Sequence, residues 1–263
     1  MTLFDDVARS ATVLALLLSR GYGLLLAIPP LMKAGQGWMT RVPIALAIAL
    51  PTFPLAYQTI PDTLAGGQAV FIAVRELALG ALTGIFMLPL FAVPRAVGTL
   101  VDQQAGLMSI QLFDPTSAER SATIFADAFE QTALFMFVVA GGFGVLAELY
   151  AASHRFWPVA ATDLPSIEHV TDLATRGVGA MFDSAIRYAA PFVATLILLE
   201  YGIGLIGRAA PQLNVLTTSV ALKLVATLLL VAIVGPFFVD AFGNAFDAVQ
   251  AFATRFLDPA ALR

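Results

Sequence analysis

Long, continuous apolar segments constrain this chain more than any other feature. A string such as LVATLLLVAIV cannot be hidden in a soluble domain when the chain of 263 residues is 59% hydrophobic and only 12% charged, because soluble domains carry about a quarter charged residues. A membrane-spanning helix needs about twenty apolar residues. About six segments approach that length, at residues 10–32, 42–57, 69–93, 122–151, 185–207 and 215–239. The sequence therefore predicts an all-α polytopic membrane protein.

Composition and motifs exclude several other classes of protein. The apolar runs do not alternate as membrane β-strands do, and a net charge of −4 is unsuited to nucleic acid. The absence of cysteine excludes disulfides, thiolate catalysis and cysteine metal sites. No HExxH, GxSxG or phosphate-loop motif occurs, and both histidines, His154 and His169, lie in a polar connection. We therefore expect no enzyme activity, no cofactor and no metal.

Prolines and charged residues within the apolar segments indicate that these helices pack against protein. Prolines such as Pro89, Pro191 and Pro236 lie within or beside the apolar segments, and a proline kink is tolerated in lipid only where neighbouring protein or water satisfies the freed carbonyls. Charged residues also lie in the segments or at their rims. They are Arg20, Arg75, Glu76, Asp127, Glu130, Glu148, Glu200 and Lys223.

A charge inside a bilayer is costly, so it normally finds a partner or lines an ion pathway. No two acids are spaced to form an evident cation site, and we favour structural charge pairing by Glu76, Asp127, Glu130 and Glu200. Clusters of small residues at 80–84, 140–144 and 201–207 further predict close helix packing.

Two of the apolar segments are joined by the polar turn RAAPQLN. Pro211 ends the first helix, and so short a connection predicts an antiparallel helical hairpin. The tip and its flank, comprising Arg208, Pro211, Gln212, Asn214 and Lys223, are either a solvated turn or a partner contact. We expect one integral-membrane domain over 1–263, with N-terminal helices at 1–178 that include a loop at 95–121, the hairpin at 179–240 and a tail at 241–263.

Three stretches of this chain resemble one known family. They are LLEYGIGLIGRAAPQLNVLTTSVALK, VRELALGALTGIFMLPLFAVPRAVGTLVDQQAGLMSIQLFDP and AELYAASHRFWP. Their order and spacing are similar to those of the FliR/SctT (SpaR/YscT) family, the export-apparatus membrane proteins of type III secretion systems, over about residues 10–240. Glu200 and the stretch from Asp102 to Gln104 favour the injectisome branch over the flagellar branch.

The resemblance implies a non-enzymatic core component of an export gate in the bacterial inner membrane. It implies co-assembly with FliP/SctR-like, FliQ/SctS-like and FlhB/SctU-like subunits into a helical channel through which unfolded proteins are exported, in contact with lipid and without nucleic acid. The alternative is a stand-alone secondary transporter or ion channel that uses Asp127, Glu130 or Glu200. Transporters often show inverted repeats, and none is visible here.

The same resemblance implies that the loop from Gln104 to Asp114 lines or plugs the channel. Glycine would give this loop backbone freedom, and its apolar side chains would form a soft constriction, since methionine adapts to varied contacts. The residues concerned are Gln104, Gly106, Leu107, Met108, Ser109, Ile110, Phe113 and Asp114. The hairpin tip would face the cytoplasmic entrance and neighbouring subunits.

Overall fold

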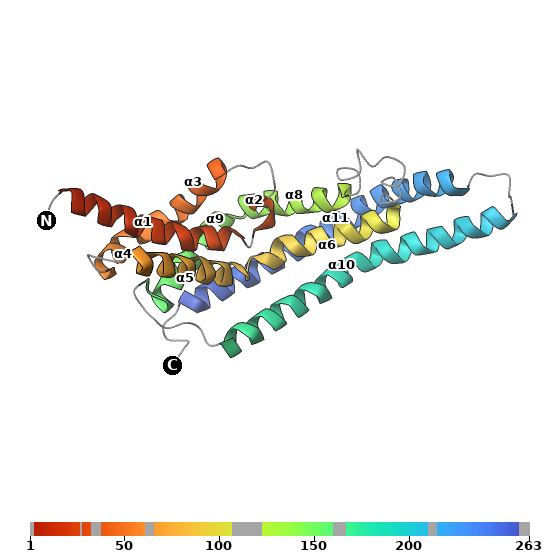
Figure 1. Cartoon of the computed structure of the whole chain (residues 1–263). Coiled ribbons are helices and arrows are strands. Elements are labelled where there is room, and N and C mark those ends of the chain that lie inside the picture. The colour runs from red at the N-terminus through yellow and green to blue at the C-terminus, as the bar shows by residue number, and fades with distance from the viewer. Residues whose placement is uncertain are drawn as a thin grey trace. The chain divides into compact units, whose positions relative to one another are not determined.

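A computed structural model describes residues 3–26, 28–32, 38–60, 66–106, 123–159, 167–209 and 215–257. These ranges are helical, with no strand among them (Figure 1). The elements are α1 (Leu3–Leu26), α2 (Pro29–Met32), α3 (Trp38–Ala49), the 3-10 turn η1 (Leu50–Thr52), α4 (Phe53–Thr59), α5 (Gly66–Gly84), α6 (Leu88–Ala105), α8 (Ile124–Val139), α9 (Gly142–Phe156), α10 (Ile167–Ala209) and α11 (Val215–Leu257).

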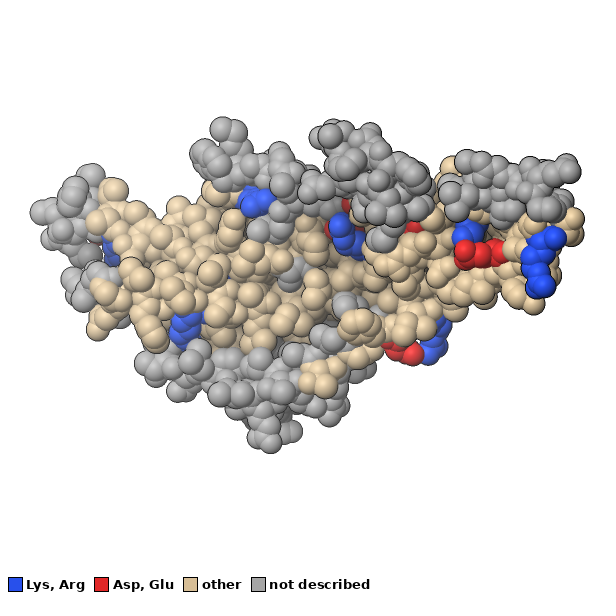
Figure 2. All heavy atoms as spheres, turned by 45° about the vertical axis from the view of Figure 1, so that its right-hand side comes forward, with Lys and Arg blue, Asp and Glu red and all other residues tan. Residues whose placement is uncertain are grey.

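Several of these helices are long and apolar enough to cross a membrane. Within the described ranges there are 3 such spans, Arg41–Thr59, Phe182–Ala209 and Ala221–Ala251, or up to 5 if two broken helix pairs each count as one. Among the described residues on the face in Figure 2, uncharged side chains predominate and acidic and basic ones are few. The chain is therefore an all-α polytopic membrane protein, as its apolar segments predict.

Two of the predicted segments are each divided between two helices that bend by more than 40° at a short break. The segment 69–93 is divided by a break after Gly84, and the segment 122–151 by a break at Gly141, whose φ of 79° is left-handed. That backbone conformation is easily adopted only by glycine. Hydropathy cannot detect such breaks, because apolar residues continue through them.

The chain forms two compact units. Unit 1 comprises Met1–Pro89, Phe137–Val178 and Phe246–Arg263, and unit 2 comprises Leu90–Met136 and Gly179–Ala245. In unit 1, α1 packs along α5 through glycines on both helices: a Cβ at Gly23 would meet the carbonyl of Leu77, and one at Gly80 the carbonyl of Arg20. Gly80 thus supplies the close approach predicted from its small-residue cluster.

We expect Gly80→Ala to destabilise unit 1 by about 1–3 kcal/mol, because the new methyl group would force two helix backbones apart. Gly179→Ala in α10 is the matched control, since a Cβ there meets nothing within 4 Å. In that variant the higher helix propensity of alanine should leave stability unchanged or raise it by up to about 1 kcal/mol. Thermal unfolding of both purified variants in detergent provides the measurement, and equal unfolding temperatures would contradict close packing at Gly80.

Unit 2 packs α6 and α8 against the antiparallel helices α10 and α11. One buried cluster joins Val101, Ala105, Phe125 and Phe192, and Leu230, Val231 and Val234 cover it. A second cluster joins Val93, Val97, Ala185 and Ala189, and its cover includes Phe129 and Phe238. The rings of Phe129 and Phe238 lie 5.2 Å apart, and those of Phe129 and Phe192 lie 6.1 Å apart.

The helices of the hairpin are longer than its apolar segments. α10 begins at Ile167, and α11 continues through the predicted tail to Leu257. The predicted segments stop beside the acidic residues Asp183 and Asp240, although both helices continue past them.

Candidate functional site

The predicted channel loop, Gln104 to Asp114, follows the end of α6, and α8 is the next described helix. The loop base is defined here as the residues of α6 and α8 that flank segment 107–122: Arg95, Gly98, Asp102, Gly106, Thr123, Phe125, Ala126, Asp127 and Glu130. Gly106 closes α6 with a left-handed φ of 78°, and its amide donates to the carbonyl of Gln103 at 3.2 Å. Such a glycine satisfies a terminal carbonyl and turns the chain away from the helix axis.

Asp102 caps α8 from the neighbouring helix. Its side chain is fully buried, and its two carboxylate oxygens each accept one backbone hydrogen bond, at 3.0 Å from Phe125 N and at 3.0 Å from Ala126 N. The first amides of a helix have no partner within the helix, and a negative charge is favoured beside them. Thr123, which precedes α8, instead donates its hydroxyl to Asp127 at 3.1 Å. Asp102 thus performs the capping role from outside the helix.

Two further contacts hold α6 and α8 together at the loop base. A Cβ at Gly98 would overlap the backbone of Ala126, so the absence of a side chain permits the two backbones to touch. One turn earlier, the Arg95 guanidinium is paired with Asp127 at 3.3 Å and with Glu130. The loop base therefore holds the last turns of α6 against the first turns of α8.

The predicted channel residues divide between this base and the loop. Gln104 lies half-buried in the last turn of α6, and Gly106 ends that helix. The others lie outside the described residues: Leu107, Met108, Ser109, Ile110, Phe113 and Asp114.

The hairpin joins two of the predicted polar residues. Lys223 of α11 lies 3.2 Å from Glu200 of α10; the lysine side chain is buried, whereas the carboxylate is exposed. Arg208 is exposed in the last turn of α10. Pro211, Gln212 and Asn214 lie outside the described residues.

Unit 1 contains a buried charge network among α1, α5 and α9. Arg20 and Glu76 have no solvent exposure, and Arg20 Nε lies 2.5 Å from Glu76 Oε2. Arg75 lies 3.4 Å from the same carboxylate and donates to the carbonyl of Val159 at 3.2 Å. Arg20 also donates to the carbonyl of Trp157 at 2.7 Å. The network places two arginines around one carboxylate and extends to the end of α9.

Sequence reasoning did not identify the three members of the loop base that lie within α6. Arg95, Gly98 and Asp102 fall in a stretch that was predicted to be a loop, yet α6 continues to Ala105. They lie three and four residues apart, which places them on one face of a helix. Helical periodicity through 95–105 was therefore the available signal.

The comparisons with known proteins identify the family. The model of a family described as "Bacterial export proteins, family 1" matches residues 11–249. The chain belongs to this family. It is 29% identical over 231 residues to Yop proteins translocation protein T of Yersinia pestis, covering 86% of this chain and 87% of that protein. It is 26% identical over 228 residues to flagellar biosynthetic protein FliR of Pectobacterium carotovorum subsp. carotovorum, covering 85% and 83%.

A third relative, secretion system apparatus protein SsaT of Salmonella typhimurium strain LT2, is 25% identical over 213 residues, covering 79% of this chain and 81% of that protein. These names confirm the resemblance to the FliR/SctT family. As a bacterial export protein of this family, the chain has a role in a secretion apparatus.

Proposed function

We propose that this bacterial export protein is a non-enzymatic core component of the type III secretion export gate in the bacterial inner membrane. In this proposal it co-assembles with FliP/SctR-like, FliQ/SctS-like and FlhB/SctU-like subunits around a channel for unfolded proteins. The observation that supports the proposal most directly is the family match across residues 11–249. Its homologues include a Yop translocation protein and a flagellar biosynthetic protein, so both the secretion and the flagellar branch are represented.

The loop base supports a role for segment 104–114 at the channel. A constriction that closes around varied chains needs a deformable loop on fixed supports. Asp102, Gly98 and Arg95 provide rigid attachment to α8, and Gly106 allows the chain to leave α6. We therefore assign the constriction to the loop and its positioning to the loop base.

The exposed apolar side chains support assembly with partner subunits. On the hairpin, the exposed fractions of Leu198 and Phe237 are 72% and 70%. Lipid or another subunit must cover such residues, and in the proposed assembly other export-apparatus subunits cover part of this surface. The hairpin tip, with exposed Arg208 at the end of α10, is then the contact toward the cytoplasmic side.

The injectisome branch is the narrower form of the proposal. Identity to the Yersinia pestis translocation protein, at 29%, exceeds that to the Pectobacterium FliR, at 26%. The pairing of Glu200 with Lys223 gives a structural use to the glutamate that favoured this branch. Since Asp127, Glu130 and Glu200 are all ion-paired, their geometry supports structural pairing rather than transport coupling.

Native mass spectrometry tests the proposed co-assembly. The tagged full-length chain would be expressed with its neighbouring membrane proteins and extracted in mild detergent. We expect one copy of the chain in a discrete hetero-oligomer with smaller hydrophobic subunits. A stable monomer or homodimer recovered without partners would contradict the export-gate proposal and return attention to a stand-alone transporter.

A further inference from the structure

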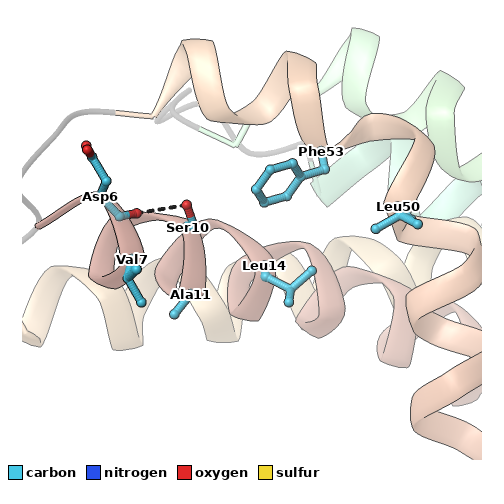
Figure 3. A pocket seen from close by; sticks show the side chains of 7 residues that line it. All are labelled: Asp6, Val7, Ser10, Ala11, Leu14, Leu50 and Phe53. Carbon is cyan, nitrogen blue, oxygen red and sulfur yellow. Dashed lines mark hydrogen bonds between the residues drawn. The ribbon is translucent and has the colours of Figure 1, made fainter. Parts of the chain in front are cut away.

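Two pockets of unit 1 differ in chemistry. The first, of about 500 Å³, lies between α1 and the η1–α4 segment, and most of its lining is apolar, including Val7, Leu14 and Phe53 (Figure 3). The Ser10 hydroxyl there donates to the carbonyl of Asp6 at 2.8 Å, and the Asp6 side chain lies at the rim. An apolar pocket with an acid beside it has no group that would recognise an anion.

The second pocket lies between α4 and α9 and is called the span-end pocket here. Its volume is about 300 Å³, at the lower end of the range of about 300–1,000 Å³ typical of small-molecule sites. Its lining includes Thr52, Leu55, Thr59, His154, Arg155 and Val159, and no aspartate or glutamate of the described ranges contributes to it.

Two side chains of this pocket have nitrogen atoms without a hydrogen-bond or ion-pair partner among the described residues. His154 is 6% exposed, its ring packs edge-on against Tyr150 at 4.7 Å, and its Nε2 has no hydrogen-bond acceptor or donor there. A buried polar atom of this kind normally has a partner. Arg155 is exposed and makes no hydrogen bond or ion pair within the described part of the chain. The pocket therefore combines a permanent positive charge with an unsatisfied imidazole nitrogen.

The pocket lies where two candidate spans end. The span Arg41–Thr59 ends at one of its lining residues, and the broken pair of α8 and α9 ends at Phe156, one residue after Arg155. Trp157 follows directly, and tryptophan is enriched at the level of lipid headgroups. Leu55, on the α4 side, is 54% exposed. The pocket thus has a cationic group where two candidate spans end and an apolar side chain beside it.

Helix C-termini normally disfavour an anion, because their free carbonyls carry partial negative charge. Here arginines from other helices already bind those carbonyls. Arg9 donates to the carbonyls of Tyr57 and Ile60 at 2.9 and 3.1 Å, while Arg20 donates to that of Trp157 at 2.7 Å. These guanidinium groups offset part of the negative charge at the ends of α4 and α9.

We propose that the span-end pocket binds a phosphate group at headgroup depth, supplied by an anionic phospholipid. The Arg155 guanidinium would pair with the phosphate oxygens, a geometry that arginine favours. His154 would donate from Nε2 in the tautomer that is protonated there, and Leu55 would lie beside the glycerol and acyl chains. This site is a property of the chain itself and does not depend on the proposed export channel.

Lipid titration of the full-length chain tests the site. The chain is purified in mild detergent, stripped of lipid and titrated with phosphatidylglycerol or phosphatidylcholine of matched acyl chains, with retained lipid counted by native mass spectrometry. We expect preferential retention of one phosphatidylglycerol. In Arg155→Gln its affinity should fall at least about tenfold, as expected when one charge-assisted hydrogen bond is lost. Arg187→Gln, which removes an exposed arginine of α10, should not change retention.

Competition with inorganic phosphate distinguishes the source of the ligand. If millimolar inorganic phosphate does not displace the retained phosphatidylglycerol, the site recognises the lipid. If inorganic phosphate displaces it, the site recognises the phosphate group irrespective of the lipid. Equal retention of the two lipids, or equal loss in Arg155→Gln and Arg187→Gln, would overturn the proposal. Because Arg155 is exposed, its replacement should leave the unfolding temperature unchanged, and that measurement separates lost binding from lost folding.

Discussion

Glu76→Gln should destabilise unit 1 by about 3–5 kcal/mol, the usual cost of removing one partner of a buried ion pair. Arg20 and Glu76 are fully buried and lie 2.5 Å apart, and Arg75 shares the same carboxylate. Glutamine preserves the shape of the side chain but removes the negative charge that pairs with the buried Arg20 guanidinium. The expected result is a lower unfolding temperature in detergent and less protein in the membrane fraction.

Two comparisons make this expectation specific to the buried network. Asp183→Asn breaks an exposed pair, since the Asp183 and Arg187 side chains are 68% and 73% exposed, and it should cost less than about 1 kcal/mol. The double variant Arg20→Met with Glu76→Met should be less destabilised than the sum of its single variants, because it removes both charges together. Additive losses in the double variant would show that the carboxylate does not act through Arg20.

The buried network shows what a sequence can and cannot supply. Arg20, Arg75 and Glu76 are conspicuous as charges within apolar segments, so the cost of an unpaired charge predicts that they have partners. Their pairing depends on the crossing of α1 and α5, where Gly80 allows the backbones to approach. A single sequence does not show which helix faces contact each other, so the ion-pair partners of these three residues could not be predicted.

The loop base was missed for a different reason. Residues 95–105 are more polar than their surroundings, and hydropathy therefore assigned them to a loop although they belong to α6. The polarity has a structural cause, because both side chains contact α8. Arg95 pairs with the carboxylate of Asp127, and Asp102 accepts a hydrogen bond from the amide of Phe125. In a chain dominated by apolar residues, a polar face that contacts protein looks the same as a solvated connection. Helical spacing distinguishes the two where mean hydropathy does not.

Asp102→Ala should release the first turn of α8 while leaving the assembly intact. The substitution removes the acceptor of two backbone amides, those of Phe125 and Ala126, and each buried donor left without an acceptor costs about 1–3 kcal/mol. We expect both amides to exchange hydrogen faster than in the parent protein. In the export gate that we propose, we also expect lower secretion and greater ion leakage, because one end of segment 107–122 is no longer fixed.

The matched control is Gln103→Ala, whose side chain is exposed on the same turn of α6 and should leave exchange, secretion and leakage unchanged. Asp102→Asn should be intermediate, since the amide oxygen can accept only one of the two hydrogen bonds while its NH₂ group faces the other donor. Faster amide exchange with normal secretion would confirm that Asp102 caps α8 but show that the loop base has no role in gating. Unchanged amide exchange would contradict the capping role of Asp102. A loss of secretion accompanied by loss of the assembled complex would instead assign Asp102 to folding alone, because a residue that positions the loop must affect transport at a constant amount of complex.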